Sequence, residues 1–269
     1  MLRRDADAAG LANWVDHLER GTLDADGVLD HFLGSMEMRS VPIRDPLLSL
    51  HQSRCDFVRL LPRARRILDL GGVDQGDVSG ALVTMGYPYP FEELAIVDLP
   101  HDERHDLYAG SARTERVVSP LGPVRYHYHS MVDLSSHADG AYDLVFSGQS
   151  IEHVSEADAD VMLAGVRRVL EPGGWFCLDT PNRRITALQL GDALTNPDHE
   201  LEYTHAQLSA KIATAGFRIV GAFGLSYCGE AAAAGVFSAE EMAHHRGVYA
   251  TPDDCYALAY VCRTPGGAP

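Results

Sequence analysis

The spacing of apolar residues divides the chain into three parts. In residues 1–40, apolar side chains recur at helical intervals and form two separate faces: Leu11, Trp14, Val15 and Leu18, then Val28, Leu29, Phe32 and Leu33. This pattern predicts a small helical appendage, which is too short to bury a core of its own and is expected to pack on the rest of the chain or on a partner. Residues 41–51 contain two prolines and are predicted to be a linker.

From residue 52 onward, short apolar runs typical of strands alternate with helical patterns. The strands are predicted at residues 65–72, 93–100, 125–131, 142–148, 174–181, 217–225 and 255–263. The clearest helix is predicted over 156–174, with a glycine stop, and a shorter one is expected to begin after Thr204 as N-cap. This alternation indicates an α/β fold with a Rossmann-like, doubly wound parallel sheet in a domain of residues 52–269.

Charge and composition narrow the class of partner. The formal net charge is -16, from 38 acidic and 22 basic residues, which disfavours a broad contact with nucleic acid or with an anionic membrane surface. No apolar run has transmembrane length, and the N-terminal arginines precede no apolar core of a secretory signal. The five cysteines are scattered and contain no C-x-x-C pair, so they indicate reduced thiols in a cytoplasmic protein and give no sign of a zinc site.

A glycine-rich turn follows the first predicted strand in "ILDLGGVDQGD", residues 67–77. Asp69 ends the apolar run, and the adjacent Gly71 and Gly72 let a ligand approach the backbone. The second strand ends in Asp98, where an acid commonly accepts hydrogen bonds from ribose hydroxyls. These features predict a nucleoside site, but the spacing is not G-x-G-x-x-G and does not by itself separate a dinucleotide from another nucleoside.

Three later segments resemble a known family when taken in order: "YDLVFSGQSIEHV", "VRRVLEPGGWFCLDTPN" and "TAGFRIV". From residue 52 to the C-terminus the chain resembles class I S-adenosylmethionine-dependent methyltransferases, although the family's usual G-x-G-x-G turn is absent. The resemblance implies a seven-stranded sheet with an antiparallel last hairpin and S-adenosyl-L-methionine at the strand carboxyl ends. It places Asp69, Gly71 and Gly72 at the methionine end of the cofactor and Asp98 at its ribose. It places Met131 near the adenine, and Ser147, Gly148 and Gln149 beneath the sulfonium.

A candidate metal site comes from the same resemblance. Metal-dependent members of the family join an E-x-x-E-H motif after the fourth strand to a later D-H-x-F-E-W-T-like run. "QSIEH" and "DHELEYT" match, which implies Mg²⁺ or Mn²⁺ held by Glu152, His153 and His199, although Gln149 replaces the first glutamate. The alternative without metal stays open, because this glutamate can also cap a helix and the histidine can relay a proton. His153 is the candidate base without an ion, and His127 or His129 with one.

The segments "SGQSIEHV" and "LDTPN" resemble methyltransferases found with bacterial glycan genes. This resemblance implies an O-methyltransferase acting on a small polyhydroxylated acceptor, a sugar or oligosaccharide in bacterial polysaccharide synthesis. Two alternatives are a phenol or quinone O-methyltransferase and a non-catalytic cofactor-binding partner subunit; a nicotinamide dehydrogenase is less favoured. The N-terminal "GLANW", "GTL" and "FLGSME" resemble a short bacterial helical repeat of unknown function, and a homodimer without nucleic-acid contact or membrane insertion is expected.

Overall fold

A computed structural model describes residues 14–18, 20–22, 45–74, 76–100 and 115–266. The chain divides between residues 44 and 45 into two compact units. In the first unit, residues 14–18 are helical, while the rest of the predicted appendage, its second helix included, lies outside the described residues apart from 20–22. The second unit carries the sheet and every candidate site residue.

The described part of the second unit contains one nine-stranded sheet in the order β3-β4-β2-β1-β5-β6-β9-β7-β8. Its seven inner strands coincide with the seven predicted ones, and β9 runs antiparallel to both of its neighbours, as the resemblance implied. Two short edge strands, β3 and β8, were not predicted. The strands are β1 (Arg66–Leu70), β2 (Glu93–Asp98), β3 (Arg116–Ser119), β4 (Gly122–Tyr128), β5 (Tyr142–Gly148), β6 (Leu170–Pro181), β7 (Arg218–Tyr227), β8 (Val248–Tyr249) and β9 (Cys255–Arg263).

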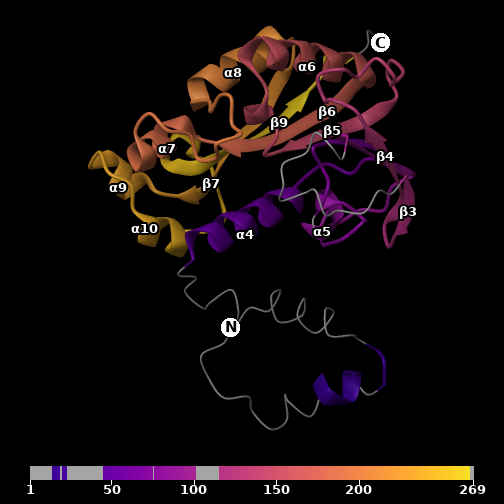
Figure 1. The fold of residues 1–269 in the computed structure, drawn as a ribbon, viewed down its shortest axis with the longest axis horizontal. Helices are drawn as coiled ribbons and strands as arrows, with labels where there is room; N and C mark the ends of the chain where they lie inside the picture. The colour runs from indigo at the N-terminus through magenta and orange to yellow at the C-terminus, as the bar shows by residue number, and fades with distance from the viewer. Residues whose placement is uncertain (1–13, 19, 23–44, 75, 101–114, 267–269) are drawn as a thin grey trace. The chain divides into compact units, whose positions relative to one another are not determined.

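Helices cover both faces of the sheet, which is why the central strands are apolar without alternation. Figure 1 shows α6 and α8 on one face and α4 and α5 on the other. Each face buries a hydrophobic cluster of its own, with Met162 of α6 in one and Phe57 of α4 in the other. The helices are α4 (Pro46–Val58), α5 (Ala81–Thr84), α6 (Glu156–Val169), α7 (Arg183–Leu190), α8 (His205–Thr214), α9 (Gly229–Ala233) and α10 (Ala239–His244), with 3₁₀ turns η2 (Ile151–His153) and η3 (Pro252–Asp254).

The ends of several predicted elements differ from the structure. The strand predicted over 125–131 is β4, which ends at Tyr128, so His129 and Met131 follow the strand. The helix predicted to run to a glycine stop at residue 174 ends at Val169, and Leu170 already pairs with Tyr142 in the sheet. Pro172 explains this, because it has no N–H to donate and disfavours helix in the residue before it. Residues 46–51, predicted as part of the linker, are the first turns of α4, where Pro46 occupies a position that tolerates proline.

The N-cap prediction for α8 is confirmed. Thr204 accepts a hydrogen bond from the N–H of Gln207, and the Gln207 side chain accepts one from the N–H of Thr204. This capping box satisfies two backbone donors at the helix start. It also ends the loop that carries His199, so the loop enters the helix in a defined direction.

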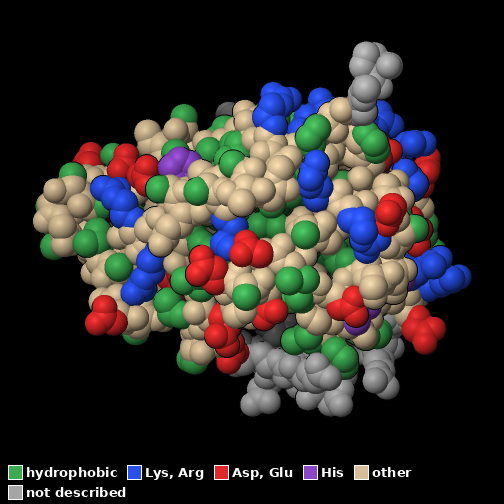
Figure 2. All heavy atoms as spheres, turned by 90° about the horizontal axis from the view of Figure 1, so that it is seen from above, with side chains coloured by type: hydrophobic (Ala, Val, Ile, Leu, Met, Phe, Trp, Pro, Cys, Tyr) green, Lys and Arg blue, Asp and Glu red, His purple; other side chains and the backbone are tan. Residues whose placement is uncertain are grey.

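The face of the molecule seen in Figure 2 carries both positive and negative side chains, although the composition is acidic. Lys and Arg side chains are interspersed there with Asp and Glu side chains. Across the part of the chain that the structure describes, helices are too short or too polar to span a bilayer. The five cysteines are unpaired, and four of them are buried.

Candidate active site

The turn after β1 forms a close-packed cradle at the carboxyl end of the sheet. Gly71 has φ +76, a conformation that favours glycine, and its N–H donates to the carbonyl of Val97 at 2.8 Å. A Cβ at Gly71 would lie 2.6 Å from Oγ of Ser150, and a Cβ at Gly72 would overlap the carboxylate of Asp69. The two glycines therefore let the turn close onto β2 and onto the loop after β5.

Asp69 is buried inside this cradle with unused hydrogen-bonding capacity. Its side chain is 1% exposed, and Oδ2 has no hydrogen-bond partner among the described residues. Burial and the negative charge of Asp98, at the end of the neighbouring strand, raise the pKa of Asp69 to about 7. A buried acceptor without a donor is costly, so this carboxylate fits a ligand group that brings N–H or O–H donors.

The raised pKa leads to a stability prediction for Asp69→Asn. The folded state holds the Asp69 proton up to about pH 7, whereas the unfolded chain releases it near 3.8, so the wild-type chain loses stability as pH rises between these values. At pH 8 the ligand-free variant should therefore be more stable than wild type by about 2–4 kcal/mol, and the gain should shrink by more than half at pH 5. Urea denaturation at both pH values measures this, with Asp56→Asn on the exposed side of α4 as control. An equal gain at both pH values would contradict the assignment.

Arg54 of α4 is the positive charge that reaches this site from the other side of the sheet. Its Nε donates to Oδ1 of Asp179 at 2.7 Å, and the Asp179 side chain, at the end of β6, is fully buried. Burial opposes the charge of Arg54, but Asp179 and then Glu152 outweigh it and raise the pKa of the guanidinium. The second oxygen of Asp179 has no hydrogen-bond partner among the described residues. The site thus contains several buried carboxylates around one arginine.

Ser147, Gly148 and Gln149 lie where β5 leaves the sheet. Ser147 is fully buried, and its Oγ also lacks a partner among the described residues. A Cβ at Gly148 would lie 2.9 Å from Nη2 of Arg54, so this glycine leaves room for the guanidinium. Gln149 has φ +54, unusual for a residue with a side chain, and its Nε2 donates to Asp179 at 2.8 Å. Backbone strain of this kind persists where the surrounding structure holds it in place.

The remaining predicted cofactor residue, Met131, follows β4 and is half-buried against the hydrophobic cluster that contains Leu134. Both Met131 and Asp98 therefore lie at the carboxyl ends of neighbouring strands. The predicted cofactor residues come from the carboxyl ends of β1, β2, β4 and β5, as expected for a ligand that crosses this edge of a doubly wound sheet.

Glu152, His153 and His199 are brought together although 46 positions separate the last two. Each offers one ligand atom, and these atoms all lie within 4.8 Å of one another. The backbone N–H groups of Glu200 and Leu201 donate to the carbonyl of Glu152 and dock the later loop onto η2. Glu152 is fully buried; Thr180 donates to its Oε2 at 2.9 Å, while Oε1 has no partner among the described residues.

The hydrogen bonds of the two histidines select their tautomers. Nδ1 of His153 lies 3.1 Å from the carbonyl of Asp198, which can only accept, so Nδ1 carries the proton. Nδ1 of His199 lies 2.9 Å from Oε1 of Glu202. Burial opposes ionisation of Glu202, but hydrogen bonds from His199, Thr186 and Thr195 outweigh it and lower its pKa to about 2. Because Nδ1 of each ring is used in this way, Nε2 is the nitrogen that each histidine can offer to a metal.

Two sequence expectations are changed in detail by these contacts. Gln149 stands at the first position of the metal motif, but its amide nitrogen donates to Asp179. His129, a candidate base, lies in a different cluster with His127 and His137. Residues that sequence reasoning missed are Arg54, Asp179 and Glu202. The last two stand in segments already singled out, "LDTPN" and "DHELEYT", whereas no local pattern marked Arg54.

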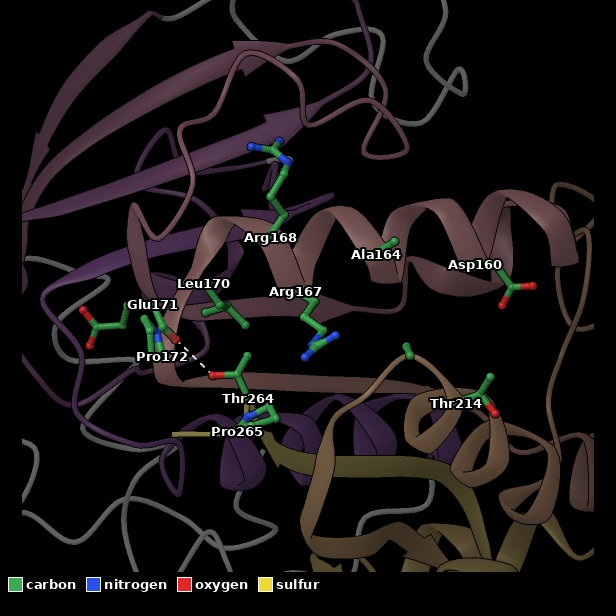
Figure 3. A pocket seen from close by; sticks show the side chains of 11 residues that line it. Asp160, Ala164, Arg167, Arg168, Leu170, Glu171, Pro172, Thr214, Thr264 and Pro265 are labelled. Atoms are coloured by element: carbon green, nitrogen blue, oxygen red, sulfur yellow. Dashed lines mark hydrogen bonds between the residues drawn. The ribbon is translucent and has the colours of Figure 1, made fainter. Parts of the chain in front are cut away.

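A hollow in the described surface lies away from this site. Figure 3 shows Arg167 of α6 above Thr264, whose hydroxyl donates to the carbonyl of Glu171 at 3.0 Å, with Leu170 and Pro172 beside them. These residues begin β6 and follow β9, so they lie at the edge of the sheet opposite the strand carboxyl ends. The hollow is therefore separate from the candidate active site.

The chain is similar to known methyltransferases in both sequence and structure. A family model described as a methyltransferase domain matches residues 101–178. A probable S-adenosylmethionine-dependent methyltransferase of Mycolicibacterium smegmatis is 38% identical over 87 residues, which cover 32% of this chain and 33% of that protein. A ubiquinone biosynthesis O-methyltransferase of Xanthomonas axonopodis is 29% identical over 147 residues, covering 54% of this chain and 56% of that protein.

The chain thus spans between a third and just over half of the length of these curated relatives. Among solved structures, a methyltransferase of Thermotoga maritima, described as a possible histamine N-methyltransferase, superposes with a TM-score of 0.55 at 15% identity. The match covers 93% of this chain and 98% of that one. At this identity the similarity establishes the fold.

Proposed function

We propose that this chain, a class I S-adenosylmethionine-dependent methyltransferase, transfers a methyl group to a hydroxyl of a small acceptor that carries adjacent hydroxyl groups. The observation that carries the proposal is the cluster of Glu152, His153 and His199 beside the glycine cradle. Ser150 links the two: its Oγ donates to the carbonyl of Leu70 at 2.7 Å and touches Gly71, and η2 follows directly. A cation and a cofactor would therefore lie on adjoining parts of one site.

The residues of the cradle suit S-adenosyl-L-methionine. Asp69 offers an unsatisfied carboxylate at the glycine turn, and Asp98 offers a carboxylate at the end of the next strand, where ribose hydroxyls are commonly bound. The bound cofactor supplies an electrophilic methyl group, so the protein's contribution is mainly alignment of the acceptor oxygen with that methyl. The buried position of Ser147 and the constrained backbone of Gln149 favour such alignment, because both are held by packing.

Two imidazoles and one carboxylate favour a particular kind of divalent ion. Mg²⁺ prefers oxygen ligands in a near-ideal octahedron, whereas imidazole suits softer first-row ions. We therefore expect Mn²⁺ to bind more tightly than Mg²⁺. A bound ion lowers the pKa of a hydroxyl that it contacts. Glu152 is the buried ligand and sets the position, and Glu202 orients His199 through its Nδ1–H.

A divalent ion in this site would favour an acceptor with two adjacent hydroxyl groups, because both acceptor oxygens can bind the same cation. A sugar or oligosaccharide meets this condition and is our first candidate; a polar, cation-binding cleft suits a polyhydroxylated molecule. A catechol-like phenol also meets it, and the Xanthomonas relative, named as a ubiquinone biosynthesis O-methyltransferase, supports this second candidate. The two classes share the chelating diol and differ in the acidity and the aromatic character of the hydroxyl.

Transfer of a labelled methyl group to pooled sugars, oligosaccharides and catechols tests the proposal. We expect transfer with Mn²⁺ to at least one diol and its loss in chelator, with restoration by excess Mn²⁺. Transfer that survives chelation would remove the ion from the mechanism and leave His153 as candidate base. Binding of S-adenosylhomocysteine without transfer to any diol would contradict the O-methyltransferase proposal and favour a cofactor-binding partner subunit.

A further inference from the structure

A second histidine cluster lies at the end of β4, apart from the one proposed to hold the catalytic cation. His127 lies in β4, His129 directly follows the end of this strand, and His137 returns to them from the following loop. One ligand atom of each lies within 4.8 Å of the others. Nε2 of His129 and Nε2 of His137 are 3.2 Å apart. Two nitrogens bound tetrahedrally to one Zn²⁺ at about 2.0–2.1 Å would lie about 3.3–3.4 Å from each other.

We propose that His127, His129 and His137 form a binding site for a transition-metal ion of the Zn²⁺ class. Three imidazoles are a ligand set that suits Zn²⁺ and neighbouring ions and does not suit Mg²⁺ or Ca²⁺. Three protein ligands leave a fourth position of a tetrahedral ion to be filled by another group. This proposal stands on its own geometry and is independent of the proposed function.

The rings of His129 and His137 each have a partner at Nδ1, which orients Nε2 toward a shared ion. Nδ1 of His129 lies 3.0 Å from the carbonyl of Ser130, so Nδ1 carries the proton and Nε2 carries the lone pair. Nδ1 of His137 lies 2.7 Å from the hydroxyl of Tyr142, which can accept or donate. With an ion bound, His137 donates from Nδ1 to Tyr142 and frees Nε2 for the metal. This is the usual arrangement of a metal-ligating histidine, whose other nitrogen has a fixed partner.

The loop that carries His137 is held in place before any ion binds. Arg168 of α6 donates to the carbonyl of His137 at 2.8 Å and to that of Leu134 at 2.7 Å. His137 is buried, whereas His127 and His129 are half-buried. The ring of His127 makes ring contacts but no hydrogen bond among the described residues. His137 is therefore a buried ligand already in position, while His127 and His129 are more accessible to an approaching ion.

Metal titration of the full chain tests the site in a Glu152→Gln background, where the other cluster has lost its carboxylate. After chelation and dialysis, we expect Zn²⁺ to bind in a saturable 1:1 manner and to raise the melting temperature. Co²⁺ should give the strong visible absorption of a tetrahedral ion. When His127→Gln or His129→Gln is introduced into this Glu152→Gln protein, Zn²⁺ binding should weaken at least about 100-fold.

His244→Gln, on the exposed end of α10, is the matched control because it also removes one histidine. His127→Gln is the variant least harmful to folding, since the ring is half-buried and makes no hydrogen bond among the described residues. Circular dichroism should show its fold unchanged. Absence of saturable Zn²⁺ binding would overturn the proposal, as would equal affinity in the His127→Gln, His129→Gln and control proteins.

Discussion

Glu152→Gln should lower methyl transfer at least about 100-fold while leaving the affinity for S-adenosylhomocysteine within a factor of about two. The substitution keeps the size of the side chain and removes its charge. Glu152 is fully buried, and its unpartnered Oε1 is the atom available to a cation. Asp69 and Asp98, which we propose to bind the cofactor, belong to other strands and are unchanged. A uniform loss of cofactor binding and transfer would instead indicate a disturbed fold.

Glu200→Gln is the matched control for this prediction. It makes the same chemical change in the later loop, which docks onto Glu152, but the Glu200 side chain is exposed. The docking of this loop onto Glu152 uses backbone atoms, which neither substitution alters. Mn²⁺ affinity, measured by calorimetry, should fall in Glu152→Gln and stay unchanged in Glu200→Gln. Normal transfer by Glu152→Gln in the presence of chelator would exclude Glu152 as a metal ligand in catalysis.

Much of the fold could be predicted from sequence because each inner strand is a short apolar run followed by a polar or glycine-rich turn. The methyltransferase-domain model matches residues 101–178, which contain "DLVFS" and "RVLEPGGWF", and the solved neighbour confirms the fold that the resemblance implied. The edge strands β3 and β8 were not predicted because strands of four and two residues are too short to show an alternation of apolar and polar residues. The predicted end of α6 at residue 174 was wrong because it was placed at the glycines. Pro172 comes before them and disfavours helix in the residue that precedes it.

The candidate site was only partly predictable, for a different reason. Residues next to a strand end, such as Asp69 and Asp98, follow from the parallel sheet, whose strands all end at one edge. His199 was reached through its local motif, and the structure places it beside Glu152 and His153. Arg54 could not be found in this way. It projects from the middle of α4, and its role depends on crossing the sheet edge to Asp179, a contact 125 positions apart.

This contact matters because Arg54 faces several carboxylates in a buried setting. Asp179 and Glu152 both act on Arg54, and Arg54 in turn holds the pKa of Asp69 lower than burial and Asp98 alone would set it. Replacing one partner of a buried ion pair is strongly destabilising, because the remaining charge keeps its desolvation cost and loses its compensation. An exposed pair lacks this effect, since water solvates the charge that is left.

Arg54→Met should therefore reduce the free energy of unfolding by about 3–5 kcal/mol at pH 8. The loss should be smaller at pH 5.5: without Arg54 the pKa of Asp69 rises further, so stability declines more steeply as pH increases. Arg59→Met on the same helix is the control, because the Arg59–Asp56 pair is exposed and should contribute less than about 1 kcal/mol. Adding Asp179→Asn to Arg54→Met should recover part of the loss, since it removes the stranded charge. Urea unfolding measures all four proteins, and equal losses for Arg54→Met and Arg59→Met would show that the buried pair has no special role.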